Sequence, residues 1–237
     1  MFDRRGHLIA CCGSAFGKRA LCEVLPNGKA RVIVDCYHGI RLNSPNDLVI
    51  DKHSRIYFSD PRYLGPEPME LDHMSVYRHD PDGTLTRLDT GLTKPTGLVI
   101  SPDGKTMYIG ESDNGSTTSD PPPPGTKKRM TLNSYPVNPD GSLGERRMLI
   151  DYAGTDAGVD GMTVDVHGNV YAAITAEKAV VVYSHQGKER MRIAFPEFTT
   201  NCCFGRNEES NRLYVTAGKS LYRIRLRIDG FHPATAK

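Results

Sequence analysis

Residues 41–61 read RLNSPNDLVIDKHSRIYFSDP, and this stretch contains the unit from which the fold is built. A polar turn leads into the apolar run Leu48–Ile50, a second polar turn follows, and then comes an alternating run with two aromatic residues. Two short runs of strand-forming residues joined by such a turn are typical of a β-hairpin. The first strand begins just after Asn46 and Asp47, so an amide and a carboxylate stand side by side at its start.

The same unit recurs along the chain. Further copies begin at Phe2 (FDRRGHLIACCG), Leu98 (LVISPDGKTMYIGES), Met162 (MTVDVHGNVYAAI) and Cys202 (CCFGRNEESNRLYVTAG). A second type of hairpin separates successive copies, for example SVYRHDPDGTLTRLD at residues 75–89. Two hairpins make four strands, and the copies begin roughly every 40 to 65 residues, the size of a propeller blade. The sequence therefore predicts an all-β fold, a β-propeller of about four and a half to five blades.

Length and composition fit one such domain over residues 1–237. The first repeat lacks most of its first strand and the last repeat lacks its fourth, so we expect an N-terminally truncated domain. The net charge of +2 gives no electrostatic reason to expect a nucleic-acid partner. No apolar run approaches the roughly 20 residues of a membrane helix, so we also expect no membrane partner. The oligomeric state is not predicted.

The six cysteines have no metal-binding CxxC spacing and are Cys11, Cys12, Cys22, Cys36, Cys202 and Cys203. We expect most of them to be buried as small apolar side chains, which favours a reducing compartment and hence the cytoplasm. No signal peptide is visible. Because the N-terminus looks truncated, a periplasmic or secreted location stays open.

The residues that come just before the inner strands carry the candidate chemistry. Equivalent positions in successive repeats hold Asn46, Thr96, Asp160 and, as an open alternative, Asn201. Inner strands line the channel of a propeller, so these short oxygen-bearing side chains are expected to converge on the axis. A ring of oxygens around one carboxylate is what a calcium-like cation needs. The alternative is that they only shape turns, but the match between Asn46 and Asp160 favours a site.

Other catalytic patterns are absent from the sequence. There is no HxH or HExxH pattern for zinc and no GxSxG nucleophile elbow. The proline-rich segment between Asp113 and Met130 is too long for a simple hairpin loop. It is predicted either to cover the channel mouth as a lid or to be a surface insertion.

Five stretches together resemble one known family: RLNSPNDLVID (41–51), RIYFSDPRY (55–63), GLVISPDGKTMYI (97–109), VDGMTVDVHGNVYAA (159–173) and TTNCCFGRNEESNRLYVTAG (199–218). They look like the gluconolactonase, senescence-marker-protein (regucalcin) and luciferin-regenerating-enzyme family. The resemblance implies a six-bladed propeller that hydrolyses sugar lactones at one divalent cation on its axis. Calcium is the expected cation, with zinc, manganese and magnesium as alternatives.

Carried over by motif, the resemblance makes Asp160 a metal ligand and the catalytic base. It makes Asn46 a metal-linked and substrate-binding residue, and Asp47 a supporting or substrate-facing carboxylate. Two departures stand out. The family's inner-strand Asn is Thr96 here, a weaker ligand, and the family's first-blade Glu, in an EGP or ESP motif, has no counterpart in this chain.

The expected function is therefore a gluconolactonase-like hydrolase whose partner is a small lactone. Because of the two departures, the alternatives are a catalytically impaired or non-catalytic binding scaffold, and a related hydrolase of aryl or organophosphorus esters. Which lactone is used, and whether this chain is active without the family's Glu, are not predicted.

Overall fold

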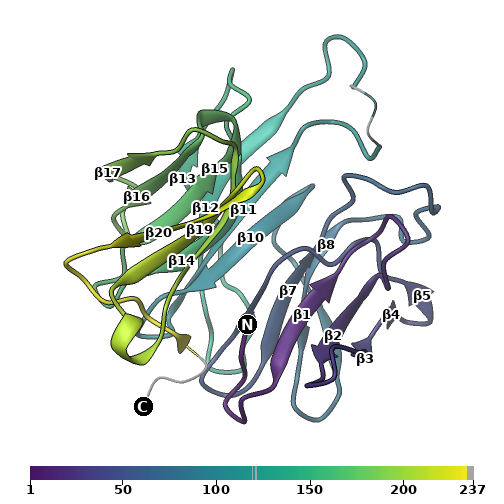
Figure 1. Cartoon of the computed structure of the whole chain (residues 1–237). Coiled ribbons are helices and arrows are strands. Elements are labelled where there is room, and N and C mark those ends of the chain that lie inside the picture. Colours follow the sequence, from purple (N-terminus) through teal and green to yellow (C-terminus); the bar gives the residue numbers. More distant parts are fainter. Residues whose placement is uncertain (119, 121, 234–237) are drawn as a thin grey trace.

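The computed structural model describes residues 1–118, 120 and 122–233, and their sheets fan around a common axis (Figure 1). Residues 119 and 121 of the predicted lid, and residues 234–237 of the predicted domain, lie outside the described residues. The described chain forms five blades, and the predicted all-β propeller of four and a half to five blades is confirmed. No helix in the described part of the chain is long and apolar enough to cross a membrane.

Every blade is an antiparallel sheet whose strands follow one another in chain order. Blade 1 contains β1 (Leu8–Cys12), β2 (Ala20–Val24) and β3 (Ala30–Val34), and a small hairpin of β4 (Cys36–Tyr37) and β5 (Ile40–Arg41) follows it. Blade 2 contains β6 (Leu48–Ile50), β7 (Ile56–Asp60), β8 (Ser75–His79) and β9 (Leu85–Leu88). Blade 3 contains β10 (Pro95–Ile100), β11 (Thr106–Asp113), β12 (Arg129–Pro136) and β13 (Arg147–Asp151).

The last two blades complete the described chain. Blade 4 contains β14 (Val159–Val164), β15 (Val170–Ile174), β16 (Ala179–Tyr183) and β17 (Glu189–Ala194), with the single 3-10 turn η1 (Thr175–Glu177) between β15 and β16. Blade 5 contains β18 (Thr199–Phe204), β19 (Arg212–Ala217) and β20 (Ser220–Arg225), with η2 (Asn207–Glu209) between β18 and β19.

The innermost strands of blades 2 to 5 are β6, β10, β14 and β18. In blade 1, among the residues that the structure describes, Met1 and Phe2 take the same place. Met1 exchanges two backbone hydrogen bonds with Ile9, and Phe2 forms a bridge with Leu8. By this pairing β1 corresponds to the second strand of the other blades. Arg206 of blade 5 lies over the Phe2 ring at 5.2 Å, so the first and last blades touch there.

The core lies between blades, because alternate side chains of each strand point to opposite faces. One apolar cluster fills each gap between successive blades. Between blades 2 and 3, for example, Val49 and Tyr57 pack with Leu98 and Ile109, all fully or almost fully buried. Each blade is therefore positioned by its neighbours, and so are the residues at its inner edge.

The connections divide between the two mouths of the channel. Strands alternate in direction, so the turns after the first and third strand of a blade lie at one mouth. The loops after the second strand, and the links from one blade to the next, lie at the other. The long β11–β12 loop, drawn at the top of Figure 1, is therefore at the same mouth as Asn46, Thr96 and Asp160.

The cysteines differ from their expectation. All six are free, but only Cys22 and Cys202 are buried, whereas Cys203 is exposed and the other three are half-buried. The prediction that most are buried is wrong, because Cys11 and Cys203 line the open space between blades 1 and 5, and Cys36 lies in the small β4–β5 hairpin outside the blades.

Asp60, at the end of β7, generates a testable effect of pH on stability. It is fully buried and accepts the backbone N–H groups of Asn43 and Ser44, and burial raises its pKa to about 7. Its carboxyl group binds a proton more tightly in the folded protein than in the unfolded chain, where the pKa is about 3.9. Its contribution is thus fully present below about pH 4 and is lost as the pH rises through about 7.

We expect the free energy of unfolding from urea titrations to fall between pH 4 and pH 7, by at most about 1.4 kcal/mol per pH unit for this one group. Asp60→Asn should lower stability at pH 5, because an amide has only one acceptor oxygen, but should flatten the fall. Equal slopes for the wild type and the variant would contradict the assignment.

Candidate functional site

Strand register establishes which residues are equivalent at the channel mouth. The strands β10, β14 and β18 each begin with a pair that precedes a bulge, formed by Pro95, Val159 and Thr199, and Leu98, Met162 and Cys202 stand three positions after these residues. In β6 the first paired residue, Leu48, corresponds to them. Two positions before them stand Asn46, Thr96, Asp160 and Thr200. The predicted equivalence of the first three is confirmed. The alternative that placed Asn201 with them is wrong by one residue, because Thr199 forms the pair before the bulge that Pro95 and Val159 form in their strands, and the residue after it is Thr200.

Asn46, Thr96 and Asp160 line one cavity of about 340 Å³. They come from the starts of inner strands in blades 2, 3 and 4. Tyr63 from the β7–β8 loop and Asn114 from the β11–β12 loop also line this cavity. The predicted site residues are therefore brought together at one mouth, with the exception of Asp47, which lies elsewhere.

A close backbone contact makes this convergence possible. A Cβ atom built on Gly97 would lie 2.0 Å from the carbonyl oxygen of Asp160. Real Cβ atoms do not approach backbone oxygen so closely, so only glycine fits between the two inner strands. The glycine that follows Thr96 thus sets how near Thr96 stands to Asp160.

Asp160 is half-buried and has an unusual acidity. Burial raises the pKa of its carboxyl group to about 7, the negative charge of Asp47 adds to this rise, and a hydrogen bond from Thr175 opposes it. A carboxylate whose pKa lies near neutrality can both accept and return a proton under physiological conditions. Asp160 is therefore suited to act as a general base.

The oxygen donors at the cavity are mostly neutral. Thr96 is buried and its hydroxyl donates to the carbonyl oxygen of Val159 at 2.8 Å, which leaves its lone pairs available. Asn46 is exposed, and its side chain has no hydrogen-bond partner among the described residues. Within the same residues no group of three or more His, Cys, Asp or Glu side chains is placed to hold a metal ion. The three predicted residues offer one carboxylate, one amide and one hydroxyl, all hard oxygen donors.

Asp47 faces away from this set. One carboxylate oxygen accepts the N–H of Leu48 at 2.9 Å, and the other accepts the N–H of Leu98 at 3.3 Å. Since Leu98 belongs to the next blade, Asp47 links blades 2 and 3. Burial raises its pKa to about 6. The structure gives Asp47 a supporting part, and its contact with substrate stays a prediction.

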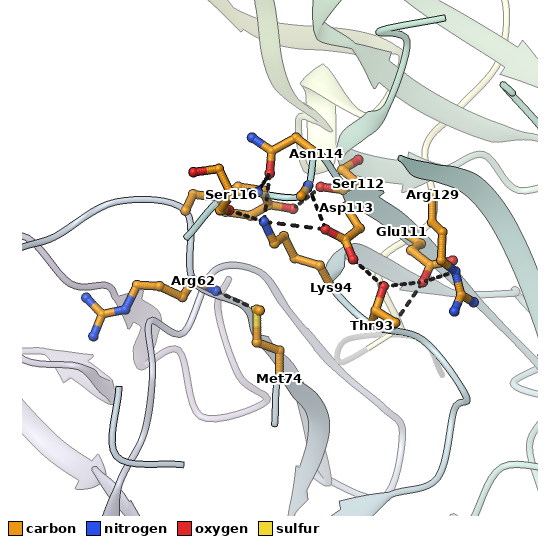
Figure 2. A network of polar contacts seen from close by, with 12 residues as sticks. Arg62, Met74, Thr93, Lys94, Glu111, Ser112, Asp113, Asn114, Ser116 and Arg129 are labelled. Carbon is orange, nitrogen blue, oxygen red and sulfur yellow. Dashed lines mark hydrogen bonds and ion pairs between the residues drawn. The ribbon is translucent and has the colours of Figure 1, made fainter. Parts of the chain in front are cut away.

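Three residues at the mouth were not singled out by the sequence as functional, and two of them are drawn in Figure 2. Lys94 is buried, and its ammonium group donates to Asn114 Oδ1 at 2.7 Å and to the Ser116 carbonyl, and forms an ion pair with Asp113 at 3.7 Å. The third, Tyr63, lies with its ring 4.7 Å from the same ammonium group. No sequence pattern predicts this cluster, because its residues come from loops of two different blades.

The start of the predicted lid is held in place by this cluster. Asp113 ends β11 and also accepts the Thr93 hydroxyl at 2.5 Å, beside the buried Glu111 (Figure 2). The loop therefore leaves blade 3 from a fixed base, and Asn114 at that base lines the cavity. This location fits the lid alternative; opening and closing stay a prediction.

A second cavity, of about 610 Å³, extends along the channel to the space between blades 1 and 5. Its wall is mainly apolar and includes Phe2, Leu8, Phe204 and Leu221. Asn46 lines both cavities, so it stands where they approach each other. The polar chemistry is concentrated in the smaller cavity.

Comparison with known proteins gives a consistent picture. The family model described as "SMP-30/Gluconolactonase/LRE-like region" matches residues 1–219. A gluconolactonase of Zymomonas mobilis is 31% identical over 90% of this chain and 59% of its own length, so this chain spans about three fifths of that relative.

Solved structures agree with this match. A gluconolactonase from Xanthomonas campestris superposes with a TM-score of 0.77 at 30% identity, over 97% of this chain and 70% of that one. The calcium-binding protein regucalcin from Agrobacterium tumefaciens has a TM-score of 0.69 at 21% identity, over 96% of this chain and 79% of that one, and shows the fold alone.

The link made by Asp47 can be tested by stability. Asp47→Ala leaves two backbone N–H groups without their acceptor, so we expect the free energy of unfolding to fall by about 1 to 3 kcal/mol. The exposed Asp89 provides the matched control, and Asp89→Ala should stay within about 0.5 kcal/mol of the wild type. Equal urea midpoints for the two variants would show that Asp47 does not join the blades.

Proposed function

Because the chain belongs to the SMP-30/gluconolactonase/LRE-like family, we propose that it hydrolyses sugar lactones at the cavity lined by Asn46, Thr96 and Asp160. One observation carries the proposal. Three successive inner strands deliver an amide, a hydroxyl and a carboxylate of raised pKa to the same cavity. The gluconolactonase relatives from Zymomonas and Xanthomonas support the choice of substrate class.

The side-chain oxygens at the cavity are of the type that a hard divalent cation prefers as ligands. Asp160, Asn46 and Thr96 would hold it, and calcium suits such carboxylate, amide and hydroxyl oxygens. A cation bound there would polarise the lactone carbonyl and stabilise negative charge on its oxygen. Only one of the three donors is charged, so we expect weak binding.

Asp160 performs the proton transfers in this proposal. Its carboxylate takes a proton from a water molecule as the water oxygen attacks the lactone carbonyl carbon. The ring C–O bond then breaks, and the ring oxygen leaves as an alcohol with the proton that Asp160 returns. The neutral amide of Asn46 orients the substrate or the water. Asp47, held by two N–H groups, keeps a negative charge near Asp160 that favours uptake of the proton by Asp160.

Cavity size also supports a small substrate. A volume of about 340 Å³ lies at the lower end of the range for small-molecule pockets, which suits a molecule the size of a monosaccharide lactone.

A non-catalytic binding scaffold is the second candidate. It is favoured by Thr96, whose hydroxyl donates to Val159 and offers a poorer ligand than an amide oxygen. It is also favoured because Asp160 is the one carboxylate among the three proposed ligands. An esterase for aryl or organophosphorus substrates is a third. A panel of glucono-δ-lactone, phenyl acetate and paraoxon separates the three, since only the lead predicts preference for the lactone.

Removal of the general base is the direct test. Asp160→Asn should lower kcat/KM for glucono-δ-lactone by about 10²- to 10⁴-fold, because proton transfer to a positioned base contributes that much. A pH-stat assay with calcium present measures it. Asp151→Asn, an exposed carboxylate of β13, is the control and should leave the rate unchanged. An Asp160→Asn variant as active as the wild type would remove Asp160 from the mechanism.

Cation binding is measured separately by isothermal titration with calcium, zinc, manganese and magnesium chlorides. We expect the wild type to bind calcium with Kd below about 1 mM, a value typical of the weaker calcium sites. Asp160→Asn should weaken this at least tenfold. If the wild type binds no calcium at concentrations up to about ten times the expected Kd, and hydrolyses no lactone, the non-catalytic binding scaffold is favoured.

A further inference from the structure

Lys94 immediately precedes the inner strand β10 but does not itself line the cavity in the described part of the chain. Its side chain is 1% exposed. An ammonium group is a donor only, so each neighbour must present an acceptor to it. The neighbours are the carbonyl of Ser116, the carboxylate of Asp113 and the side-chain oxygen of Asn114.

This chemistry determines which way the Asn114 amide is turned. Its Oδ1 atom accepts from Lys94 at 2.7 Å and from the N–H of Ser116 at 3.2 Å. The reverse orientation would place an NH2 group against two donors. The amide nitrogen therefore lies on the side away from Lys94 (Figure 2). Among the described residues no acceptor is bonded to it, although Asn114 lines the cavity.

Tyr63 completes the same wall from the neighbouring blade. Its hydroxyl donates to the carbonyl oxygen of Ser112 at 3.0 Å, and its ring lies against the Lys94 ammonium. A cation over an aromatic face is favourable and is strengthened by exclusion of water. Lys94 thus fixes two cavity-lining side chains, one from the β7–β8 loop and one from the β11–β12 loop.

We propose that Lys94 is a positioning residue that presents the Asn114 NH2 group to the cavity, as a hydrogen-bond donor for a hydroxyl group of a polyhydroxylated lactone. This rests on the proposed function and specifies the substrate class of the same site. Asn114 distinguishes a sugar lactone from an unsubstituted lactone of the same ring size, because the unsubstituted ring has no hydroxyl oxygen to accept its N–H.

The test compares glucono-δ-lactone with δ-valerolactone. Asn114→Asp keeps an acceptor for Lys94 and for the Ser116 N–H, but removes the NH2 donor. It should lower the ratio of kcat/KM for the sugar lactone to that for δ-valerolactone about tenfold, the value of one hydrogen bond of about 1.4 kcal/mol. Asn27→Asp makes the same chemical change in the exposed β2–β3 turn and should leave the ratio unchanged. A ratio within twofold of wild type for Asn114→Asp would overturn the proposal.

A double-mutant cycle tests whether Lys94 acts through Asn114. Lys94→Met should lower the selectivity ratio in the wild type, mainly by raising KM for the sugar lactone. In an Asn114→Ala background it should have little further effect on the ratio, because the group it positions is already gone. Equal effects in both backgrounds would show that Lys94 only supports folding.

A binding measurement separates this proposal from the proposed function. 1,5-Anhydro-D-glucitol is a polyhydroxylated ring with no lactone carbonyl, and its Kd is measured by NMR titration. If Asn114→Asp binds 1,5-anhydro-D-glucitol more weakly than the wild type, and the wild type hydrolyses no lactone, the role of Asn114 as a donor is supported and the proposed hydrolase function is rejected. If the wild type hydrolyses lactones but Asn114→Asp has the same selectivity ratio and the same Kd for 1,5-anhydro-D-glucitol, the hydrolase function is supported and the role of Asn114 as a donor is rejected.

Discussion

The contact between Gly97 and the carbonyl of Asp160 is the constraint on which the site depends. It lets the inner strands of blades 3 and 4 meet with backbone against backbone, so that the side chains flanking it face a common cavity. The apolar clusters between blades supply the force that maintains this approach. Any side chain at position 97 would separate the two strands and, with them, Thr96 and Asp160.

Most of the architecture could be predicted from the sequence, because a propeller is a local pattern repeated. Alternating strands and short turns recur at blade length, and the positions before Leu48, Leu98 and Met162 match without any knowledge of distant contacts. The same logic failed at Asn201. There two adjacent cysteines fit the pattern equally well, and only strand pairing, which places Thr199 before the bulge, shows that Thr200 holds the equivalent position.

The rest could not be predicted, since it arises between segments far apart in the chain. Asp47 bonds to Leu98, 51 positions away, and so becomes a link between blades. The raised pKa of Asp160 depends on its burial and on its proximity to Asp47, and neither can be read from a motif. Lys94 meets Asn114 and Tyr63 through two loops whose paths are not set by propensity. Motifs predicted the candidate base, Asp160, while its surroundings could be known only from the fold.

The separation of the two channel mouths has a practical consequence for handling the protein. The β2–β3 and β8–β9 turns contain Gly28 and Gly83, and both glycines have positive φ and open space around the Cα atom. They lie at the mouth opposite the cavity. Exposed turns of this kind tolerate insertion well. A tag, dye or surface linker inserted there would orient the molecule so that the mouth with Asn46, Thr96 and Asp160 faces the solution.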